Sequence, residues 1–238
     1  EPEGMVVDST GLITWIPTSP GMYGPITLSV SDSGQDNTES AIEEWYVFVE
    51  EFTDLITMEY KFYNRANLIS FLGIPGDSSL TSVFSSIEDE IHSVLTSGAA
   101  SIYTNGNWYG SVQNIKPDKG YWVILNNEPE ELSYIEFEIE AIPTDPNQIY
   151  SLSAGQNLIS YIGPDSISIG AAIPDSVEPY FTSIISDGKA AIKIDGQWYG
   201  SLHYMERLKG YWVHVTEDIE FSFESEIDLS RDNQQSIS

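Results

Sequence analysis

The sequence contains no cysteine and few basic residues, and both absences restrict what the protein can be. Without cysteine it has no disulfide framework and no thiolate zinc site, although the absence of cysteine does not exclude export. Only 9 lysine and arginine residues stand against 37 aspartate and glutamate residues, which gives a formal net charge of −28. Because so acidic a chain repels nucleic acid and anionic membrane surfaces, we expect no nucleic-acid partner.

Long hydrophobic runs are also missing. No apolar run reaches the roughly eighteen residues of a membrane span, so we expect no membrane insertion. The first residues, Glu1-Pro-Glu-Gly4, lack the basic-then-apolar layout of a signal peptide. We therefore interpret the chain as a mature piece of a larger protein. Its excess of carboxylates has two interpretations, a solvated acidic surface, as in a saline habitat, or a set of calcium sites.

What the sequence does contain is a tandem repeat in which matching motifs lie 90 residues apart. Three motifs recur, Asn67-Leu-Ile-Ser70 as Asn157-Leu-Ile-Ser160, Asn107-Trp-Tyr-Gly-Ser111 as Gln197-Trp-Tyr-Gly-Ser201, and Gly120-Tyr-Trp-Val123 as Gly210-Tyr-Trp-Val213. A period this long indicates two copies of a small domain rather than a solenoid of short units. We place the copies at residues 53–140 and 141–228, with a front segment at 1–52 and a polar tail at 229–238.

The front segment contains short runs of branched and aromatic residues separated by turn signals, which predicts antiparallel β structure. Four stretches, Pro2-Glu-Gly-Met5, Asp8-Ser-Thr-Gly-Leu-Ile-Thr-Trp15, Pro17 and Gly24-Pro-Ile-Thr-Leu-Ser-Val-Ser-Asp32, resemble the later half of the putative-Ig, cadherin-like domains of bacterial surface proteins. The resemblance implies part of an Ig-like β-sandwich. Asp32, Asp36 and Asn37 form a candidate calcium site in one loop, with plain hydration of that loop as the alternative.

Each copy of the repeat is expected to be a small antiparallel β module with one short helix. Ser78 or Ser79 can cap that helix in the first copy. The apolar residues of 91–96 would extend the helix, but the second copy has Pro179 and Asp187-Gly188 in the equivalent span, so we predict a strand there. The dipeptides Asn105-Gly106 and Asp195-Gly196 predict type I′ hairpin turns.

The motifs Gly155-Gln-Asn-Leu-Ile-Ser160 and Lys209-Gly-Tyr-Trp-Val213 resemble a module found, often in series, in large secreted and cell-surface proteins of bacteria and archaea. The resemblance covers both copies and implies an extracellular or cell-surface location, with no activity attached. The predicted fold class is mainly β, a partial Ig-like segment followed by two tandem copies of a small antiparallel β module.

Catalytic chemistry finds little support in the repeat. The three histidines occupy unmatched positions in the two copies, and Ser111 and Ser201 lack the flanking glycines of a nucleophile elbow. Carboxylate pairs are too abundant for a glycosidase pair to be singled out. We therefore expect a protein that is not an enzyme and has no cofactor, calcium excepted.

The recurring aromatic residues are the best candidates for ligand contact. Adjacent residues of a strand point to opposite faces, so one member of each pair Trp108-Tyr109 and Trp198-Tyr199 can be exposed and stack on a sugar or a protein. The alternatives are that Tyr109 and Tyr199 cap the sheet through their hydroxyls, with Trp122 and Trp212 in the core, or that these rings pack between modules.

The function expected from the sequence is that of a non-catalytic extracellular segment of a larger bacterial surface or secreted protein, a spacer and interaction module. Its partners would be other domains of the parent protein, a polysaccharide or a surface protein. The alternatives are a carbohydrate-binding accessory module and a calcium-stabilised adhesion segment.

Overall fold

The structure, a computed structural model, describes residues 4–8, 10–15, 17, 19–30, 41–49, 55–131 and 133–223. It is mainly β, with several antiparallel sheets and two short α-helices, which confirms the predicted fold class at that level. The chain divides into two compact units, residues 1–53 and 54–238. The first boundary lies one residue from the one predicted, and both copies of the repeat belong to the second unit. No helix of the described residues is long and apolar enough to cross a membrane.

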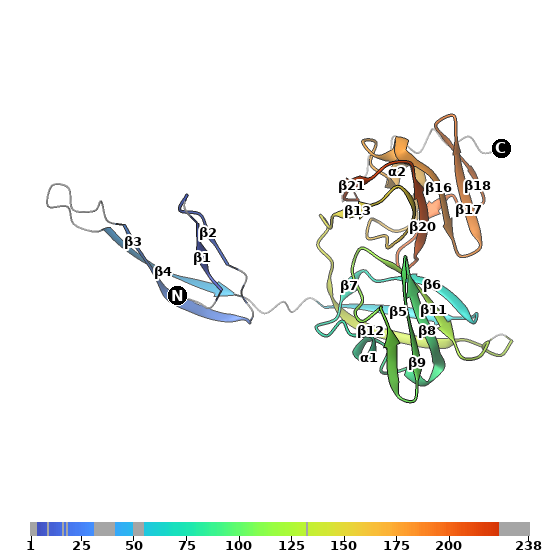
Figure 1. Ribbon diagram of the computed structural model, residues 1–238, viewed down its shortest axis with the longest axis horizontal. Coiled ribbons are helices and arrows are strands. Elements are labelled where there is room, and N and C mark those ends of the chain that lie inside the picture. The colour runs from blue at the N-terminus through green and yellow to red at the C-terminus, as the bar shows by residue number, and fades with distance from the viewer. Residues whose placement is uncertain are drawn as a thin grey trace. The chain divides into compact units, whose positions relative to one another are not determined.

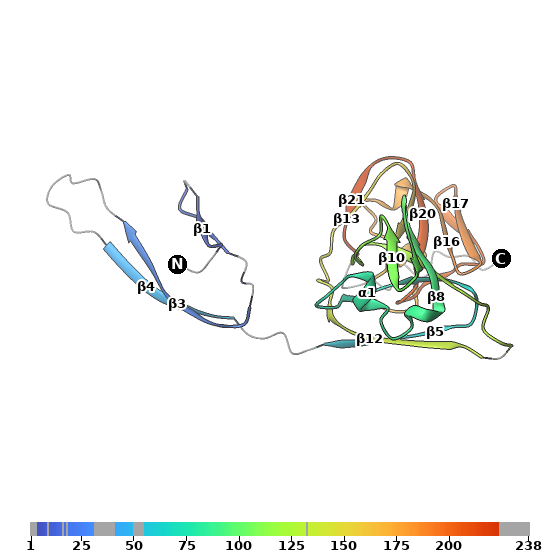
Figure 2. The ribbon, with the colours of Figure 1, turned by 60° about the horizontal axis from the view of Figure 1, so that its bottom comes forward.

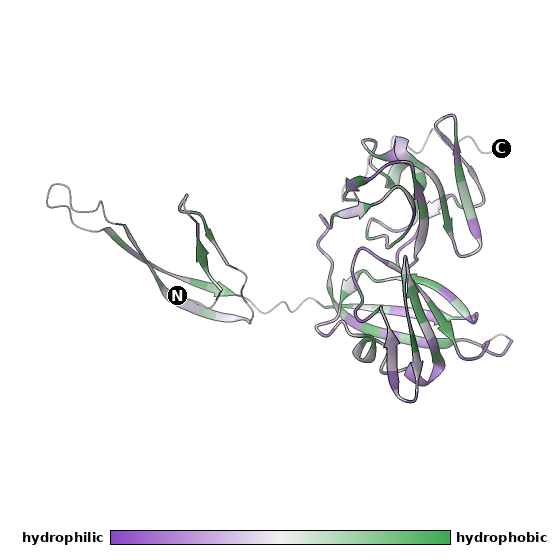
Figure 3. Ribbon diagram, viewed as in Figure 1, coloured by the Kyte–Doolittle hydropathy of each residue, from purple (hydrophilic) through white to green (hydrophobic). Residues whose placement is uncertain are grey.

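The first unit contains two hairpins of antiparallel strands. They are β1 (Val6–Val7) with β2 (Ile13–Thr14), and β3 (Gly21–Val30) with β4 (Ala41–Val49). Both are rich in hydrophobic residues, seen as green segments in Figure 3. Ile26 is buried, whereas Met22, Tyr46 and Phe48 are largely exposed. The residues of the proposed calcium site, Asp32, Asp36 and Asn37, lie outside the described residues.

The first copy is built on a five-stranded antiparallel sheet with the order β10-β9-β8-β11-β6 (Figure 1). Its strands are β6 (Ala66–Ser70), β8 (Ile91–Thr96), β9 (Ala99–Thr104), β10 (Asn107–Gly110) and β11 (Gly120–Leu125). The predicted strand at 91–96 is thereby confirmed. Asn105 and Gly106 both have positive φ, 51° and 75°, as the predicted type I′ turn requires.

A second sheet of the first copy pairs β5 with β12, and β12 with β7. These strands are β5 (Ile56–Phe62), β7 (Gly73–Ile74) and β12 (Ile135–Pro143). Figure 2 shows β5 and β12 running side by side, with α1 (Leu80–Val83) nearby. Ser79 caps α1, since its hydroxyl accepts a hydrogen bond from Ser82 N at 3.3 Å. A 3-10 turn, η1 (Glu88–Glu90), then leads into β8.

The second copy has the same strand order in its five-stranded sheet, read as β18-β17-β16-β20-β14. Its strands and helices are β13 (Tyr150–Leu152), β14 (Gly155–Ile159), β15 (Ile167–Ser168), α2 (Ile169–Ala172), η2 (Glu178–Tyr180), β16 (Phe181–Ser186), β17 (Lys189–Ile194), β18 (Gln197–Gly200), β19 (Tyr204–Met205), β20 (Tyr211–Val215) and β21 (Ile219–Phe221). Here β13 pairs with β21, as β5 pairs with β12 in the first copy.

Each copy buries its own hydrophobic core, because the two clusters of buried residues share no member. Aromatic rings dominate both. In the first copy Phe84 and Tyr60 each pack against Phe137, at 5.2 and 5.3 Å between ring centroids. In the second, Tyr150 stacks on Phe221 at 5.4 Å. The side chains that fill these cores come mainly from strand positions of alternating exposure.

The structure corrects one prediction about these cores. Trp122 and Trp212 are not core residues but lie half-buried on the opposite face of the sheet, while the neighbouring Tyr121 and Tyr211 are each 1% exposed. Each tyrosine hydroxyl accepts a hydrogen bond from a backbone N–H, that of Lys116 at 2.8 Å for Tyr121. Residues on both faces of β11 are apolar, so the period of two gives no preference there, and the tyrosine whose hydroxyl finds a backbone partner enters the core.

Burial of these tyrosines predicts a loss of stability at high pH. Burial raises the pKa of Tyr211 well above its ordinary value near 10. The unfolded chain therefore loses the phenol proton first, so this contribution to stability is fully present below pH ~10 and is lost as the pH rises. Well above pH ~10, each such tyrosine lowers the free energy of unfolding by about 1.4 kcal/mol per pH unit. Between pH 10 and 11 the phenol of the unfolded chain goes from about half to about nine-tenths ionised, so the Tyr211→Phe variant should lose about 1 kcal/mol less stability than the natural chain over that unit, measured by urea unfolding.

The control for this comparison is Tyr109→Phe, which removes a phenol from an exposed position. Parallel stability curves for the natural chain and Tyr211→Phe above pH 10 would contradict the expectation.

Candidate functional site

The four aromatic residues predicted to contact a ligand divide between two faces. Trp108 lies half-buried against the core, 6.1 Å from Phe84 between ring centroids, and Trp198 packs against the second core. Tyr109 and Tyr199 are 55% and 40% exposed on the other side of the same strands. The tryptophan and tyrosine of each pair therefore cannot form one stacking platform, and only the tyrosines present a ring to solvent.

The two tryptophans also differ in their polar contacts. Trp198 Nε1 donates a hydrogen bond to Glu178 Oε1 at 2.9 Å, and Lys193 Nζ lies 3.1 Å from the same oxygen. In the first copy Glu88 and Tyr103 take the places of Glu178 and Lys193. Trp108 Nε1 is buried without a hydrogen-bond partner within the described part of the chain. Both rings serve packing, and of the two charged residues around Trp198 the copies share the glutamate but not the lysine.

The five-stranded sheet of each copy presents an apolar face away from its core, and we call this the outer face. Directly opposed residues of neighbouring antiparallel strands share a face. Trp122 pairs with Leu95, and Tyr109 with Ile102. The second copy repeats the pattern 90 residues later. The outer face of the first copy comprises Leu95, Ile102, Tyr109 and Trp122, and that of the second comprises Ile185, Ile192, Tyr199 and Trp212.

Several residues of the outer faces are unusually exposed for apolar side chains. Ile102 is 46% exposed, and Ile185 and Ile192 are 45% and 48% exposed. Single exposed hydrophobic residues are ordinary on proteins, but clusters mark interaction surfaces. The isoleucines were not predicted from the sequence to be part of a surface. The available signal was the recurrence of apolar residues at these positions in both copies, Leu95 and Ile102 in the first and Ile185 and Ile192 in the second.

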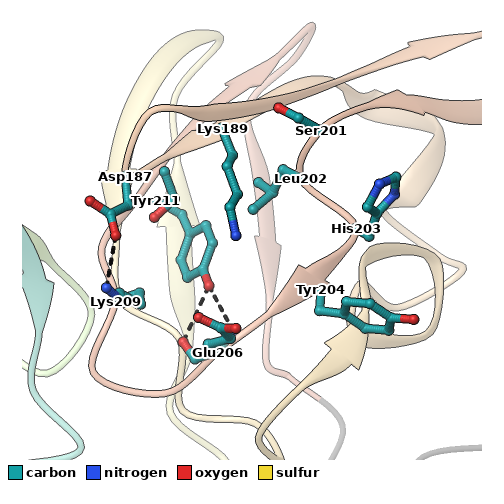
Figure 4. Close-up of a pocket in the computed structure, with 10 residues that line it drawn as sticks. Asp187, Lys189, Ser201, Leu202, His203, Tyr204, Glu206, Lys209 and Tyr211 are labelled. Carbon is teal, nitrogen blue, oxygen red and sulfur yellow. Dashed lines mark hydrogen bonds and ion pairs between the residues drawn. The ribbon is translucent and has the colours of Figure 1, made fainter.

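A small polar pocket lies in the second copy beside the turn between β16 and β17 (Figure 4). Lys209 Nζ pairs with Asp187 Oδ2 at 2.9 Å, and Glu206 N donates to the Tyr211 hydroxyl at 2.6 Å. The Lys189 side chain extends into the pocket and has no ion-pair partner among the described residues. The pocket volume is about 80 Å³, well below the ~300 Å³ at which ligand pockets usually begin.

The charged set of this pocket does not recur in the first copy. Alanine and serine, Ala99 and Ser97, occupy the positions of Lys189 and Asp187, and Lys116 replaces Glu206. Ser201 and His203 both line the pocket, yet the serine hydroxyl accepts a hydrogen bond from Ala190 N at 3.3 Å. No hydrogen bond joins Ser201 to His203 in the described structure. The pocket therefore lacks the nucleophile and base contact of a hydrolase.

A larger cavity of about 460 Å³ lies between the two copies. Its lining is mostly apolar and includes Ile56, Leu72, Ile162 and Phe223, and Arg207 is its charged residue. Arg207 is already engaged through Nε, which donates to Gly163 O at 2.8 Å. Within the described residues no group of three or more acidic, histidine or cysteine side chains is arranged to hold a metal ion. The cavity thus has room for a ligand but few polar groups to orient one.

Comparisons with protein-family models, with curated proteins and with solved structures found no match to this chain.

Proposed function

We propose that the chain is a non-catalytic segment of a bacterial extracellular or cell-surface protein that acts as a spacer and interaction module. The observation that carries the interaction role is the outer face, which both copies present at equivalent positions. Two equivalent apolar faces on one chain fit a binding role better than catalysis, which needs charged or nucleophilic groups in a pocket. The extracellular assignment rests on the resemblance of the repeat motifs to modules of surface proteins.

The spacer role is supported by how the repeated motifs are used. Tyr121 and Tyr211 fill the two cores, and the glycines that precede them allow the copies to approach each other. By contrast, the charged pocket occurs in one copy alone. Residues of the recurring motifs therefore maintain structure, and the charged set of the pocket is not repeated in the first copy.

Carbohydrate binding is the second candidate, favoured by the exposed rings of Tyr109 and Tyr199. Flat exposed rings stack on sugars as well as on protein side chains. The two candidates differ in the class of partner and use the same face, so one set of variants tests both.

The test measures binding of purified polysaccharides and of extracellular proteins by tryptophan fluorescence, since Trp122 and Trp212 lie on the outer faces. We expect a protein partner whose binding is lost in Tyr109→Ala and Tyr199→Ala, with stability changed by less than about 0.5 kcal/mol because both rings are exposed. The matched control is Tyr46→Ala, an exposed tyrosine of the first unit. A polysaccharide response that disappears in the same two variants would replace this proposal with the carbohydrate one. Binding that survives in both variants would show that the outer face is not the binding surface.

A further inference from the structure

The two copies are joined by backbone hydrogen bonds that obey the same 90-residue offset as the sequence motifs. Ile69 forms an antiparallel bridge with Lys209, and Lys119 forms one with Ile159. These two bridges are counterparts of each other, one from each copy. We call the residues that make these contacts, 68–70 and 117–120 in the first copy and 158–160 and 207–210 in the second, the joint face of each copy.

The hydrogen bonds of the joint follow the same reciprocal pattern. Ser70 N donates to Leu208 O at 3.0 Å, and Ser160 N donates to Asp118 O at 3.4 Å. The serine hydroxyls add further bonds, from Ser70 Oγ to Lys209 O at 2.8 Å and from Ser160 Oγ to Pro117 O at 2.5 Å. These last acceptors depart from strict equivalence by two residues, and a further bond runs from Gly210 N to Leu68 O at 3.4 Å. The serine of Asn-Leu-Ile-Ser thus binds the opposite copy in both directions.

The glycines of Gly-Tyr-Trp-Val let the two backbones come this close. A Cβ atom on Gly120 would lie 2.7 Å from Ile159 O, and one on Gly210 would lie 2.8 Å from Ile69 O. Real Cβ atoms essentially never approach a backbone oxygen so closely. Two of the recurring motifs therefore meet at the joint, which gives a physical reason for their recurrence at a constant distance.

The joint also covers strand edges. β6 and β14 are the last strands of their five-stranded sheets, and an uncovered edge strand presents unpaired N–H and C=O groups to any other strand. β6 pairs with β11 along its length, and its last residues, 68–70, also pair with residues 208–210. Ile159, the last residue of β14, likewise lies between β20 and Lys119. The four segments of the two joint faces therefore form a closed ring. Opening the joint exposes one edge on each copy, and each edge is complementary to the other.

From this reciprocal geometry we propose that the joint face is an interaction surface whose partner is a second copy of this chain. The first copy of one molecule pairs with the second copy of another, and the reverse pair closes the dimer. All contacts of such an exchanged dimer are those of the single chain, so the tether alone decides between the two forms. The tether is short, since six residues, 144–149, separate β12 from β13. A short tether gives an effective concentration in the millimolar range and favours the closed monomer.

A high local concentration of the chain, or cleavage of the tether, would therefore favour exchange between molecules. If the chain is displayed at a cell surface, as proposed above, exchange would link neighbouring molecules, and this consequence alone rests on the proposed function. The exchange itself depends on the joint and not on the outer faces, so the two proposals can fail separately.

The test uses the whole chain with a protease site in place of residues 145–148. After cleavage we expect the two pieces to remain one complex in size-exclusion chromatography. Two cleaved preparations, one of them isotopically labelled, should then form mixed complexes on incubation, detected by native mass spectrometry. Pieces that separate while circular dichroism shows both still folded would overturn the proposal, as would a complex that never exchanges over days at 37 °C.

Two variants connect the result to the joint. Gly120→Val is expected to separate the cleaved pieces, because its side chain would collide with Ile159 O. Ser70→Ala is the milder variant, since it removes one hydrogen bond across the joint and leaves the Tyr60 hydroxyl bonded to Ser70 O. It should raise the dissociation constant of the pieces about fivefold. Unchanged affinity in Ser70→Ala, with the pieces still folded, would contradict the assignment even if Gly120→Val fails to fold.

Discussion

Replacing Tyr121 with alanine should lower the free energy of unfolding of the first copy by about 3–5 kcal/mol, the range found for removing a buried aromatic ring. The side chain is 1% exposed, its ring lies 6.0 Å from that of Phe71, and its hydroxyl accepts the Lys116 N–H. Such a loss is a large part of the stability of a small domain. Urea unfolding followed by circular dichroism should show an early transition for the first copy and a later one for the second.

The neighbouring residue provides the comparison. Trp122→Ala removes a larger ring, but from the half-buried outer face, so it should cost clearly less than Tyr121→Ala. The Tyr121→Phe variant should lose about 1–3 kcal/mol of unfolding free energy, which is less than the alanine variant loses. It keeps the ring but leaves the Lys116 N–H without its acceptor. If Trp122→Ala proved the more damaging of the two alanine variants, the assignment of faces on β11 would be wrong.

The second large effect is expected at Gly110, the glycine of Tyr-Gly-Ser. Its φ is +147°, and a Cβ built there would lie 2.2 Å from Ala100 O and 2.6 Å from Ser101 Cα. Gly200 repeats this arrangement against Ala190 O. Gly110→Ala combines a backbone collision with an unfavourable φ, so we expect a loss of about 3 kcal/mol or more in thermal or urea unfolding.

Gly98 is the matched control, because it also has a positive φ of +73° but no atom within 4 Å of a Cβ built on it. Gly98→Ala should therefore report the conformational cost alone, about 1 kcal/mol. Similar losses at the two positions would show that the approach of β9 and β10 does not require the glycine.

Local rules in the sequence predicted the hairpin turns well. Turn residues with a fixed chemistry gave the hairpins, as at Asp195-Gly196, where both residues have positive φ. Comparison of the copies was decisive for residues 91–96, because Pro179 is incompatible with a helix interior at the equivalent point. A single copy would have predicted a longer helix, since its apolar residues fit that period too.

Contacts between distant segments could not be predicted in the same way. In β11 both faces are apolar, so the alternation of side chains cannot tell Tyr121 from Trp122 as the core residue. The joint was also missed, although its motifs were recognised, because Ser70 and Gly120 look like ordinary strand residues until a second backbone lies beside them. The outer faces went unnoticed because Ile102 and Ile192 are typical strand residues wherever they point.

The pairing of the first and last described strands of each copy has a mechanical consequence. Ile56, at the start of β5, lies opposite Ala141, near the end of β12, and Tyr150 lies opposite Phe221 in the second copy. The polypeptide therefore enters and leaves each copy at the same end of an antiparallel pair. A pulling force along the chain would load these backbone hydrogen bonds one after another, like a zipper, rather than all together in shear. Each copy should thus yield at low tension and lengthen the chain gradually, so that a tether built from such modules would absorb a sudden load.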